Sequence, residues 1–347
     1  MNAIQQAIAL ALDGKELDYD QAFATMEMIM RGEATDAQIG AFLIALRMKG
    51  ETAGEIAGLA ASMRRNARTV AVPPGVQAID IVGTGGDGKH TFNISTVAAF
   101  VIAGAGVPVA KHGNRLVSSK CGSADVLEAL GVRTDLDAAE MAICLRKAGL
   151  AFLFAPVLHP AMKHAIGPRR EIGVRSVFNI LGPITNPAGV LRQVVGVYER
   201  RLVRLLAEVL QKLGSGHVMV VHSADGLDEI SLADITYVAE LKEGSITEYE
   251  VSPAEFGLQN SDAAIGGGDA ATNAGIARAV LAGESGPERD IVIANAAAGL
   301  YVAGRAQNLR EAAALAAESI DSGQAKDCLQ KLIDVTGNLK DGKKHGA

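Results

Sequence analysis

Apolar and polar positions alternate with a helical period along the first part of the chain. Apolar side chains recur three or four residues apart, which predicts four helices around Ile4–Ala11, Phe23–Ile29, Ile39–Met48 and Ile56–Met63. Three expected helix starts match a capping box, in which two side chains three residues apart satisfy each other's backbone amides; the pairs are Asp18 with Gln21, Thr35 with Gln38, and Thr52 with Glu55. Gly32 and Gly50 stand where two of these helices should end.

The pattern changes after Pro73 and Pro74, where short apolar runs begin to alternate with helical stretches. The apolar runs predict strands at Ile79–Val82, Val107–Ala110, Ala151–Ala155, Val194–Tyr198 and His217–His222. Helices are expected at Val97–Ala103, Ala124–Leu130, Ala138–Ala148 and Arg201–Leu213. This alternation predicts an α/β fold, with a mostly parallel central sheet flanked by helices.

The later part of the chain adds a hairpin and further helices. Tyr237–Leu241 and Ser245–Val251 flank a Lys-Glu-Gly turn, and alanine-rich helices are expected from Ala270 to Val335. We therefore expect a small helical domain at residues 1–72, joined by a helical segment within 160–190, and an α/β domain at 73–340. The polar residues 341–347 are expected to form a flexible tail.

Charge and cysteine content narrow the classes of protein. The 347 residues carry 33 Lys and Arg against 39 Asp and Glu, and the net charge of −6 argues against nucleic-acid binding. Cys121, Cys144 and Cys328 are widely spaced and odd in number, and they form neither a zinc motif nor a disulfide framework, which fits a reducing cytoplasm. The apolar stretch Val97–Val107 is too short to span a bilayer, and the chain opens without a signal-peptide pattern. We expect neither a membrane nor a nucleic acid as partner.

Glycines directly after the first expected strand form the first candidate binding loop. Gly83-Thr84-Gly85-Gly86-Asp87 lets the backbone turn tightly and approach a ligand, with the start of the next helix nearby to receive an anion. A plain strand-to-helix turn is the alternative. The spacing matches neither a dinucleotide-binding fingerprint nor a Walker loop, so it does not indicate generic nucleotide binding.

Polar residues around the next helix and strand extend this candidate site. Small polar side chains open the helix at Asn93–Thr96; they are either caps or hydroxyls that hold phosphate oxygens or the water of Mg²⁺. Lys111–Arg115, with Ser118, Ser119 and Ser123 after it, follows the expected strand Val107–Ala110 at its carboxyl end, where parallel sheets bind ligands. These cations, amide and hydroxyls form a candidate cradle for a polyanion, with a solvated basic loop as the alternative.

Two acidic residues indicate a metal site. Asp228 and Glu229 follow the expected strand His217–His222, and adjacent carboxylates at the end of a buried strand suit Mg²⁺, whose coordination is completed by water or phosphate. A solvated surface position is the other interpretation. Asp80 and Asp234 are alternative ligands.

Two further segments suggest how a small substrate could be held. Arg169 and Arg170, downstream of His159, can clamp a carboxylate, or else pair with Glu171. The polar turn Gly182–Pro187 follows. No Gly-x-Ser-x-Gly, His-Glu-x-x-His or Cys–His signature is present, so the inventory suits group transfer by positioning and charge stabilisation rather than covalent catalysis.

Taken together, the motifs resemble those of the anthranilate phosphoribosyltransferases, which act in the second step of tryptophan biosynthesis. The resemblance rests on segments that run in order over nearly the whole chain: Gly83–Asp87, Asn93–Thr96, Lys111–Arg115 with Ser118 and Ser119, His159–Lys163, Phe178–Pro187, and Asp228 with Glu229. It implies a helical domain packed on a larger α/β domain, an active site in the cleft near the hinge, and a homodimer joined through the helical domains. The implied reaction moves the phosphoribosyl group of 5-phospho-α-D-ribose 1-diphosphate to the amine of anthranilate and releases pyrophosphate.

The resemblance also implies a role for individual residues. It makes the α/β domain the donor-binding one, with the donor surrounded by Gly83, Gly86, Asp87, Thr91, Asn93, Ile94, Ser95, Thr96, Lys111, His112, Gly113, Asn114, Arg115, Ser118, Ser119 and Ser123. It puts Gly83, Asn114, His159 and Arg169 near anthranilate, and Mg²⁺ at Ser95, Asp228 and Glu229. Lys111, Asp228 and Glu229 would stabilise the transition state without covalent or acid–base catalysis.

Two other functions are alternatives to phosphoribosyl transfer. A pyrimidine nucleoside phosphorylase has a similar fold but binds one phosphate and would not need the acidic pair Asp228 and Glu229. A non-catalytic, nucleic-acid-binding relative should be basic and should lack the glycine loop or the acidic pair, whereas this chain is acidic and has both.

Overall fold

The chain begins with the four predicted helices, which are confirmed. In the computed structural model, which describes the backbone of residues 1–115 and 121–344 and the side chains as far as Leu339, they are α1 (Ala3–Leu12), α2 (Tyr19–Met30), α3 (Asp36–Lys49) and α4 (Ala53–Arg65). All three predicted capping boxes form. A fourth, between Asn2 and Gln5, was not predicted.

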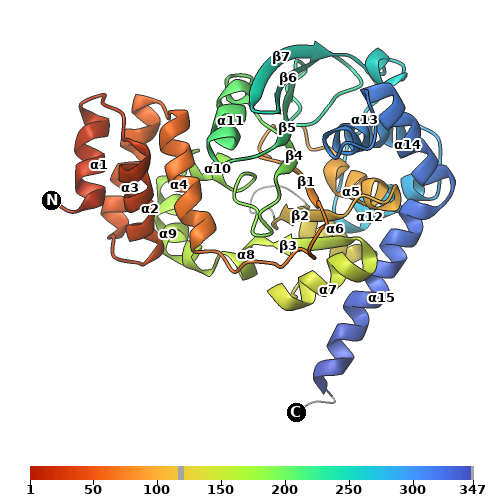
Figure 1. The fold of residues 1–347 in the computed structure, drawn as a ribbon, viewed down its shortest axis with the longest axis horizontal. Helices are drawn as coiled ribbons and strands as arrows, with labels where there is room; N and C mark the ends of the chain where they lie inside the picture. Colours follow the sequence, from red (N-terminus) through yellow and green to blue (C-terminus); the bar gives the residue numbers. More distant parts are fainter. Residues whose placement is uncertain (116–120, 345–347) are drawn as a thin grey trace.

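A later segment completes the helical domain. The helix α9 (Lys163–Ile172) packs on α2 and α3, and the short helix α10 (Phe178–Leu181) packs on α4. Figure 1 shows this group of helices at one end of the molecule, beside the sheet. The chain passes from α4 to β1, leaves the α/β part again after β3 and returns to it at β4, so three crossings join the two parts.

The α/β part is built on a seven-stranded sheet with the order β3-β2-β1-β4-β5-β6-β7. Its first five strands in space are parallel, and the hairpin β6–β7 adds two antiparallel strands at one edge. The predicted fold class is thus confirmed. The strands are β1 (Ile79–Gly83), β2 (Val109–Gly113), β3 (Leu150–Phe154), β4 (Arg192–Gly196), β5 (His217–Ser223), β6 (Thr236–Lys242) and β7 (Ser245–Val251).

One strand lies later in the sequence than predicted. We expected it at Val107–Ala110, but β2 starts at Val109 and runs to Gly113. The shift has a physical cause: Gly106 turns with a φ of 85°, and Pro108 has no N–H to donate to a ladder. Consequently Lys111 and His112 lie inside the strand rather than in a loop after it.

Helices cover both faces of the sheet (Figure 1). Apart from α8 (Ala155–Leu158) and the 3₁₀ turns Pro160–Met162 and Pro253–Phe256, they are α5 (Ile94–Gly104), α6 (Ser123–Leu130), α7 (Ala138–Ala148), α11 (Arg201–Lys212), α12 (Ala270–Leu281), α13 (Pro287–Val302), α14 (Leu309–Asp321) and α15 (Gln324–Lys344). The helix α15 runs to Lys344, so the tail predicted at 341–347 overlaps it as far as that residue. None of the described helices combines the length and apolar character that a transmembrane span requires.

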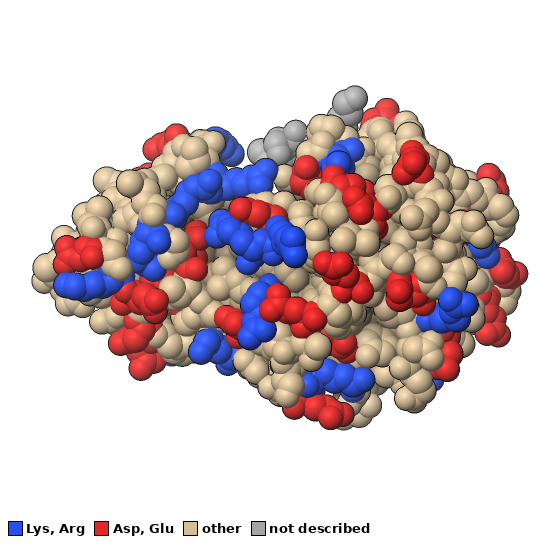
Figure 2. Space-filling model, turned by 90° about the horizontal axis from the view of Figure 1, so that it is seen from above, with Lys and Arg blue, Asp and Glu red and all other residues tan. Residues whose placement is uncertain are grey.

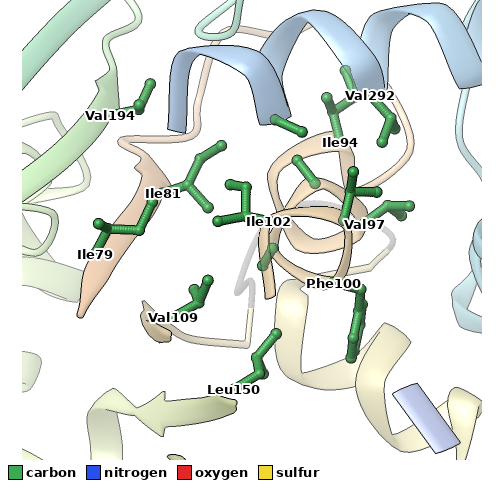
Figure 3. Close-up of a cluster of buried hydrophobic side chains, with 14 of the residues drawn as sticks. Ile79, Ile81, Ile94, Val97, Phe100, Ile102, Val109, Leu150, Val194 and Val292 are labelled. Carbon is green, nitrogen blue, oxygen red and sulfur yellow. The ribbon is translucent and has the colours of Figure 1, made fainter. Parts of the chain in front are cut away.

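Alternate residues of the strands face two separate cores. On one face, Ile79, Ile81 and Val109 pack against the apolar side chains of helix α5, as Figure 3 shows. On the other face, Val218 and Val220 join α11 and the helical domain in a single cluster of buried residues. The helical domain is therefore fixed to the sheet by a shared core as well as by its three connections.

A buried ion pair holds the helical domain together. The carboxylate of Glu55 is fully buried; it accepts hydrogen bonds from the amides of Leu17 and Thr52 at 2.9 Å each and pairs with Lys49 Nζ at 2.9 Å. One side chain thus joins the starts of α2 and α4 to the end of α3.

We predict that Glu55→Ala lowers the free energy of unfolding by about 3–5 kcal/mol, because Lys49 would remain buried without its partner. Urea unfolding followed by circular dichroism measures the change. Glu33→Ala, at an exposed position of the same domain, is the control and should stay within about 0.5 kcal/mol of the wild type. Equal stability of the two variants would contradict the assignment.

Candidate active site

The candidate site lies where the strand order reverses. The chain goes from β1 to β2 on one side, whereas β4 pairs with β1 on the other side, so the carboxyl ends of β1 and β4 lie at a topological switch point, where parallel α/β sheets bind ligands. Both strands end in glycine there, with Gly83 directly opposite Gly196. The loop that follows β5 lies across these two glycines and carries Asp228 and Glu229.

Both glycines are required by the close approach of Asp228. A Cβ on Gly83 would lie 2.7 Å from Asp228 Oδ2, and one on Gly196 would lie 1.6 Å from the carbonyl oxygen of Asp228. The amide of Gly85 donates to Asp228 Oδ2 at 2.7 Å. This hydrogen bond brings the glycine loop Gly83–Asp87 into contact with the acidic pair across 143 residues of sequence.

The second carboxylate is tied to the start of α5 and to β2. Glu229 Oε1 accepts from the amide of Ser95 at 3.2 Å. Lys111 Nζ, buried within the sheet, donates to Ser95 Oγ at 3.2 Å and to the carbonyl oxygen of Ile81 at 2.5 Å. Residues from β1, β2, α5 and the loop after β5 therefore converge on one polar cluster.

The charges in this cluster do not balance. Burial, and then the neighbouring Asp87, raise the pKa of Asp228 to about 7; burial, and then Asp228, raise the pKa of Glu229 to about 8. Burial lowers the pKa of Lys111, although Asp80 and Glu229 oppose that shift. Several buried carboxylates repel one another around a single lysine, and a bound cation would relieve that repulsion.

The donor set fits Mg²⁺ in particular. Among the described residues, no three His, Cys, Asp or Glu side chains form a group that could enclose a metal ion by themselves. Mg²⁺ does not need such a cage, because it is commonly held by one or two carboxylates together with water and substrate phosphates. Asp228 and Glu229, with the hydroxyl of Ser95 nearby, supply that kind of partial site.

The two alternative acidic residues have other surroundings. Asp80, in the middle of β1, is fully buried; its oxygens accept from the amide of His112 at 3.1 Å and from Asn186 Nδ2 at 2.8 Å. Asp234 is exposed and accepts from the amide of Ile235 at 2.7 Å. Asp80 is thus a structural partner of the strand that carries Lys111, and neither residue belongs to the acidic pair.

The polar residues before α5 do not act as helix caps. Asn93 occupies the cap position but makes no capping hydrogen bond with its side chain. Instead Asn93 Oδ1 accepts from Asn273 Nδ2 at 3.0 Å, and Asn93 Nδ2 donates to the carbonyl oxygen of Cys121 at 3.4 Å. Its side chain is therefore held by α12 and by the segment before α6, which leaves the amide end of α5 to other partners. Thr91 precedes it in a bridge to Gly266.

The basic segment after β2 is only partly directed to this cluster. Arg115 pairs with Asp125 at 2.9 Å and with Glu128, and its guanidinium lies 5.7 Å from the ring centre of Phe154. The hydroxyl of Ser123 donates to the carbonyl oxygen of Asn114 at 3.1 Å. Ser118 and Ser119 lie outside the described residues. Arg115 is thus occupied by α6, although the resemblance assigns it to the donor.

Two buried histidines lie next to the cluster. The ring centres of His112 and His159 are 5.2 Å apart, and the buried Nε2 atom of each has no hydrogen-bond partner among the described residues. His112 Nδ1 contacts the carbonyl oxygen of Gly182 at 3.0 Å. Burial, followed by the neighbouring His159, lowers the pKa of His112 to about 3, and burial lowers the pKa of His159 to about 4. Both rings are therefore neutral near pH 7, and Nε2 of each is the nitrogen that has no partner among the described residues.

The arginine pair divides into one half-buried and one exposed side chain. Arg169 lies with its guanidinium 5.0 Å from the ring centre of Phe178, and burial lowers its pKa. Arg170 and Glu171 are exposed. No ion pair joins either arginine to Glu171 in the part of the chain that the structure describes, so the alternative of a local salt bridge is not what positions Arg169.

Three residues that contact the site were not predicted from the sequence. Asn186 donates to Asp80 and to the carbonyl oxygen of Ala110, Asn273 donates to Asn93, and Arg175 Nη2 donates to the carbonyl oxygen of Gly86 at 2.7 Å. Each contact joins segments more than 70 residues apart. No local motif marks Asn273 or Arg175, whereas Asn186 lies in a polar turn that was noted without a role.

The surface around the site has an uneven charge distribution. Figure 2 shows Lys and Arg side chains gathered from the helical domain toward the middle of one face. Asp and Glu prevail at the end of the α/β domain that lies away from the helical domain. An acidic protein thus presents a local basic surface where its two domains meet, which suits an anionic ligand.

The fold and the polar cluster define a glycosyltransferase of two domains. Residues 75–326 match the family described as glycosyl transferase family, a/b domain, and residues 5–67 match its helical bundle domain. The chain is 53% identical over 340 residues to the anthranilate phosphoribosyltransferase of Pelotomaculum thermopropionicum, covering 98% of each chain. It is 55% identical over 334 residues to that of Anaeromyxobacter sp. strain K, covering 96% of this chain and 98% of the relative.

Solved structures agree with these sequence matches. The anthranilate phosphoribosyltransferase of Thermus thermophilus superposes with a TM-score of 0.91 at 42% identity, covering 97% of this chain and 99% of the other. The Saccharomyces cerevisiae enzyme in complex with PRPP and Mg gives a TM-score of 0.87 at 28% identity, covering 96% and 98%. The chain therefore belongs to the anthranilate phosphoribosyltransferase family.

We predict that Gly196→Ala disrupts the site while the fold survives. The new Cβ would displace the backbone of Asp228, and a displacement of about 1 Å can lower kcat/KM on the order of a hundredfold. Gly275→Ala in α12, where a Cβ meets no atom within 4 Å, is the matched control and should keep full activity. Steady-state kinetics and circular dichroism of both variants test this, and an active Gly196→Ala would contradict the described packing.

The histidine pair predicts how stability depends on pH. The folded-state pKa values, about 3 for His112 and about 4 for His159, lie below the ordinary value of 6.5. Between these values and pH 6.5, the unfolded chain therefore binds more protons than the folded chain. The stability they contribute is present above pH 6.5 and is lost as the pH falls toward 4, by about 1.4 kcal/mol per pH unit for each histidine.

Urea unfolding at a series of pH values measures this slope. His112→Asn together with His159→Asn should flatten it, while His90→Asn, at an exposed position, should leave it unchanged. The same slope in the double variant and the wild type would show that other groups cause the pH dependence.

Proposed function

We propose that the polar cluster at the ends of β1, β2 and β4 transfers the phosphoribosyl group of 5-phospho-α-D-ribose 1-diphosphate to the amine of anthranilate, with release of pyrophosphate. The observation that carries this proposal is the junction of the glycine loop with the acidic pair, through the hydrogen bond of 2.7 Å from Gly85 to Asp228. Relatives that match over nearly the full chain carry the name of this activity. The reaction is the second step of tryptophan biosynthesis from chorismate.

The donor is assigned to the glycine loop, the start of α5 and the end of β2. Gly83, Gly86, Asp87, Thr91 and the segment Asn93–Thr96 would surround the diphosphate and ribose, together with Lys111–Asn114 and the serines 119 and 123. The only contacts of Lys111 Nζ run to Ser95 and Ile81 among the described hydrogen bonds, so its charge is held at the site rather than neutralised by a direct ion pair. Arg115 needs to leave Asp125 and Glu128 before it can contact the donor.

Mg²⁺ would be held by Asp228 and Glu229, with Ser95 beside them. The relative from S. cerevisiae is described in complex with PRPP and Mg, which supports the same ion here. When bound, the ion neutralises charge on the diphosphate leaving group. The protein's contribution is to keep two carboxylates buried side by side and to direct the amide of Ser95 and Lys111 at the same region.

Anthranilate is assigned to the side of the cluster formed by His159 and Arg169, near Gly83 and Asn114. The relative from S. cerevisiae has a structure in complex with 4-fluoroanthranilate. The carboxylate of anthranilate would be held by Arg169, whose guanidinium lies 5.0 Å from the ring centre of Phe178. The aromatic amine is neutral near pH 7 and already has a free electron pair, so the site needs orientation at C1 of the ribose rather than a general base.

The neutral histidines fit this assignment. A protonated imidazole next to Lys111 would add positive charge near the amine's path, whereas burial keeps the pKa of His112 at about 3 and that of His159 at about 4. Each ring has a buried Nε2 without a hydrogen-bond partner in the part of the chain that the structure describes. We infer that these nitrogens exchange hydrogen bonds with the substrate.

The protein would act as a homodimer joined through the helical domain. Large apolar side chains are exposed on α1, α2, α3, α9 and the turn after α9: Leu12, Tyr19, Met48, Ile166 and Val174. Met48 is 82% exposed and would be available for burial in such an interface. The comparisons give no support to the phosphorylase and nucleic-acid-binding alternatives, because the relatives and structures reported above carry the name anthranilate phosphoribosyltransferase.

Anthranilate fluorescence tests the function directly. The chain contains no tryptophan, so protein emission does not interfere with that of the substrate. We expect the fluorescence to fall when donor and Mg²⁺ are both present, to remain when EDTA replaces Mg²⁺, and to fall again when Mg²⁺ is restored. Folded protein that leaves the fluorescence unchanged with both present would overturn the proposal.

We predict that Arg169→Ala raises the anthranilate KM about tenfold or more, because a charge-assisted carboxylate contact is lost, while the donor KM changes little. Arg170→Ala, its exposed neighbour, is the control and should leave both KM values unchanged. Equal increases in the two KM values for Arg169→Ala would contradict the assignment of Arg169 to anthranilate.

A further inference from the structure

Arg175 connects three parts of the molecule. It lies between α9 and α10, in the segment that returns from the helical domain to the sheet. Its Nη2 donates to the carbonyl oxygen of Gly86 at 2.7 Å, and its guanidinium lies 4.3 Å from the ring centre of Tyr198, just after β4. The carbonyl oxygen of Arg175 accepts a hydrogen bond from Arg47 Nη1 at the end of α3.

The contact with Gly86 is the one hydrogen bond, among those of the described residues, that joins the glycine loop to the helical domain or its connecting segment. The other hydrogen bonds of the loop run to Asp228, Gly196, Tyr198 and Lys89, all within the α/β domain. Any movement of the helical domain that shifts Arg175 is thus transmitted directly to the loop.

The glycine loop needs such a partner because its own backbone is loosely determined. Gly85 and Gly86 have φ values of 65° and 77°, and without side chains the peptide after them can rotate with little steric resistance. A carbonyl that turned toward the site would repel a diphosphate. A guanidinium bonded to the Gly86 carbonyl holds its negative end and fixes the direction of that peptide.

We propose that Arg175 is a positioning residue that couples the placement of the helical domain to the affinity of the glycine loop for the diphosphate. The proposal rests on the proposed function, because it assigns that loop to the donor. Arg47 fixes the backbone of Arg175 from α3, Tyr198 supports the guanidinium, and Gly86 receives it.

Calorimetric titration with Mg²⁺ and the donor, without anthranilate, measures the effect independently of turnover. We expect Arg175→Ala to weaken donor binding about tenfold, as for the loss of a charge-assisted hydrogen bond, and to leave the anthranilate KM unchanged. Arg175→Lys should recover part of the affinity, since it retains the charge with a single donor group. Arg170→Ala, which changes an exposed arginine near the end of α9, is the matched control and should bind the donor as the wild type does.

Arg47→Ala distinguishes coupling from direct contact with the donor. If Arg175 transmits the position of α3, then Arg47→Ala weakens donor binding in the same direction, and adding it to Arg175→Ala has no further effect. Normal donor binding by Arg47→Ala, or additive losses in the double variant, would overturn the coupling and make Arg175 a direct ligand. Normal donor binding by Arg175→Ala would overturn the whole inference.

The failure of this inference and that of the proposed function are distinguishable. A wild-type protein that does not consume anthranilate fails the function itself. A wild-type protein that consumes it, beside an Arg175→Ala variant of unchanged donor affinity and melting temperature, removes only the role of Arg175. Because Arg175 is exposed, we expect the melting temperature of each variant to remain that of the wild type.

Discussion

The site depends on one constraint, the burial of two adjacent carboxylates against the ends of two glycine-terminated strands. Asp228 lies so close to Gly83 and Gly196 that neither position has room for a Cβ. Glu229 is held beside it by the amide of Ser95. Burial, and then Asp87, raise the pKa of Asp228, while burial, and then Asp228, raise the pKa of Glu229, so these carboxylates form an unfavourable charge arrangement that a bound cation would relieve.

The remaining architecture keeps this arrangement in place. Lys111 is the only cation buried in the cluster among the described side chains. Its strand, β2, is held by Asp80 on the neighbouring strand β1, whose carboxylate accepts a hydrogen bond from the amide of the next residue, His112. Asn186 bonds Asp80 and Ala110, and so connects that strand to the segment returning from the helical domain. The core that the helical domain shares with the sheet makes this connection rigid enough to transmit the position of one domain to the other.

Much of the fold and the nucleus of the site were predictable because they rest on local patterns. Capping boxes such as Thr35 with Gln38 and the strand before Gly83 follow from side chains a few residues apart. Asp228 and Glu229 were recognisable because adjacent carboxylates after a buried strand are unusual. The start of β2 was wrong by two residues because the apolar run gave more weight to Val107 than Pro108 allowed.

The contacts that position the site could not be predicted in the same way. Arg175 with Gly86 and Asn273 with Asn93 join segments 89 and 180 residues apart, and nothing near either residue in sequence specifies its partner. Arg115 was assigned to the donor by resemblance alone, whereas its guanidinium contacts two carboxylates on α6. Such pairings emerge only when the sheet has brought distant loops to one edge.

In our proposal, Asp228 and Glu229 form a partial cation site that Mg²⁺ and the donor complete. Calorimetric titration of the donor at a pH between about 7 and 8, in two buffers of different ionisation enthalpy, measures whether they do. We expect binding that requires Mg²⁺ and releases protons from the protein, with both effects lost in Asp228→Asn combined with Glu229→Gln. Binding of equal affinity without Mg²⁺, and identical behaviour of that double variant, would contradict it.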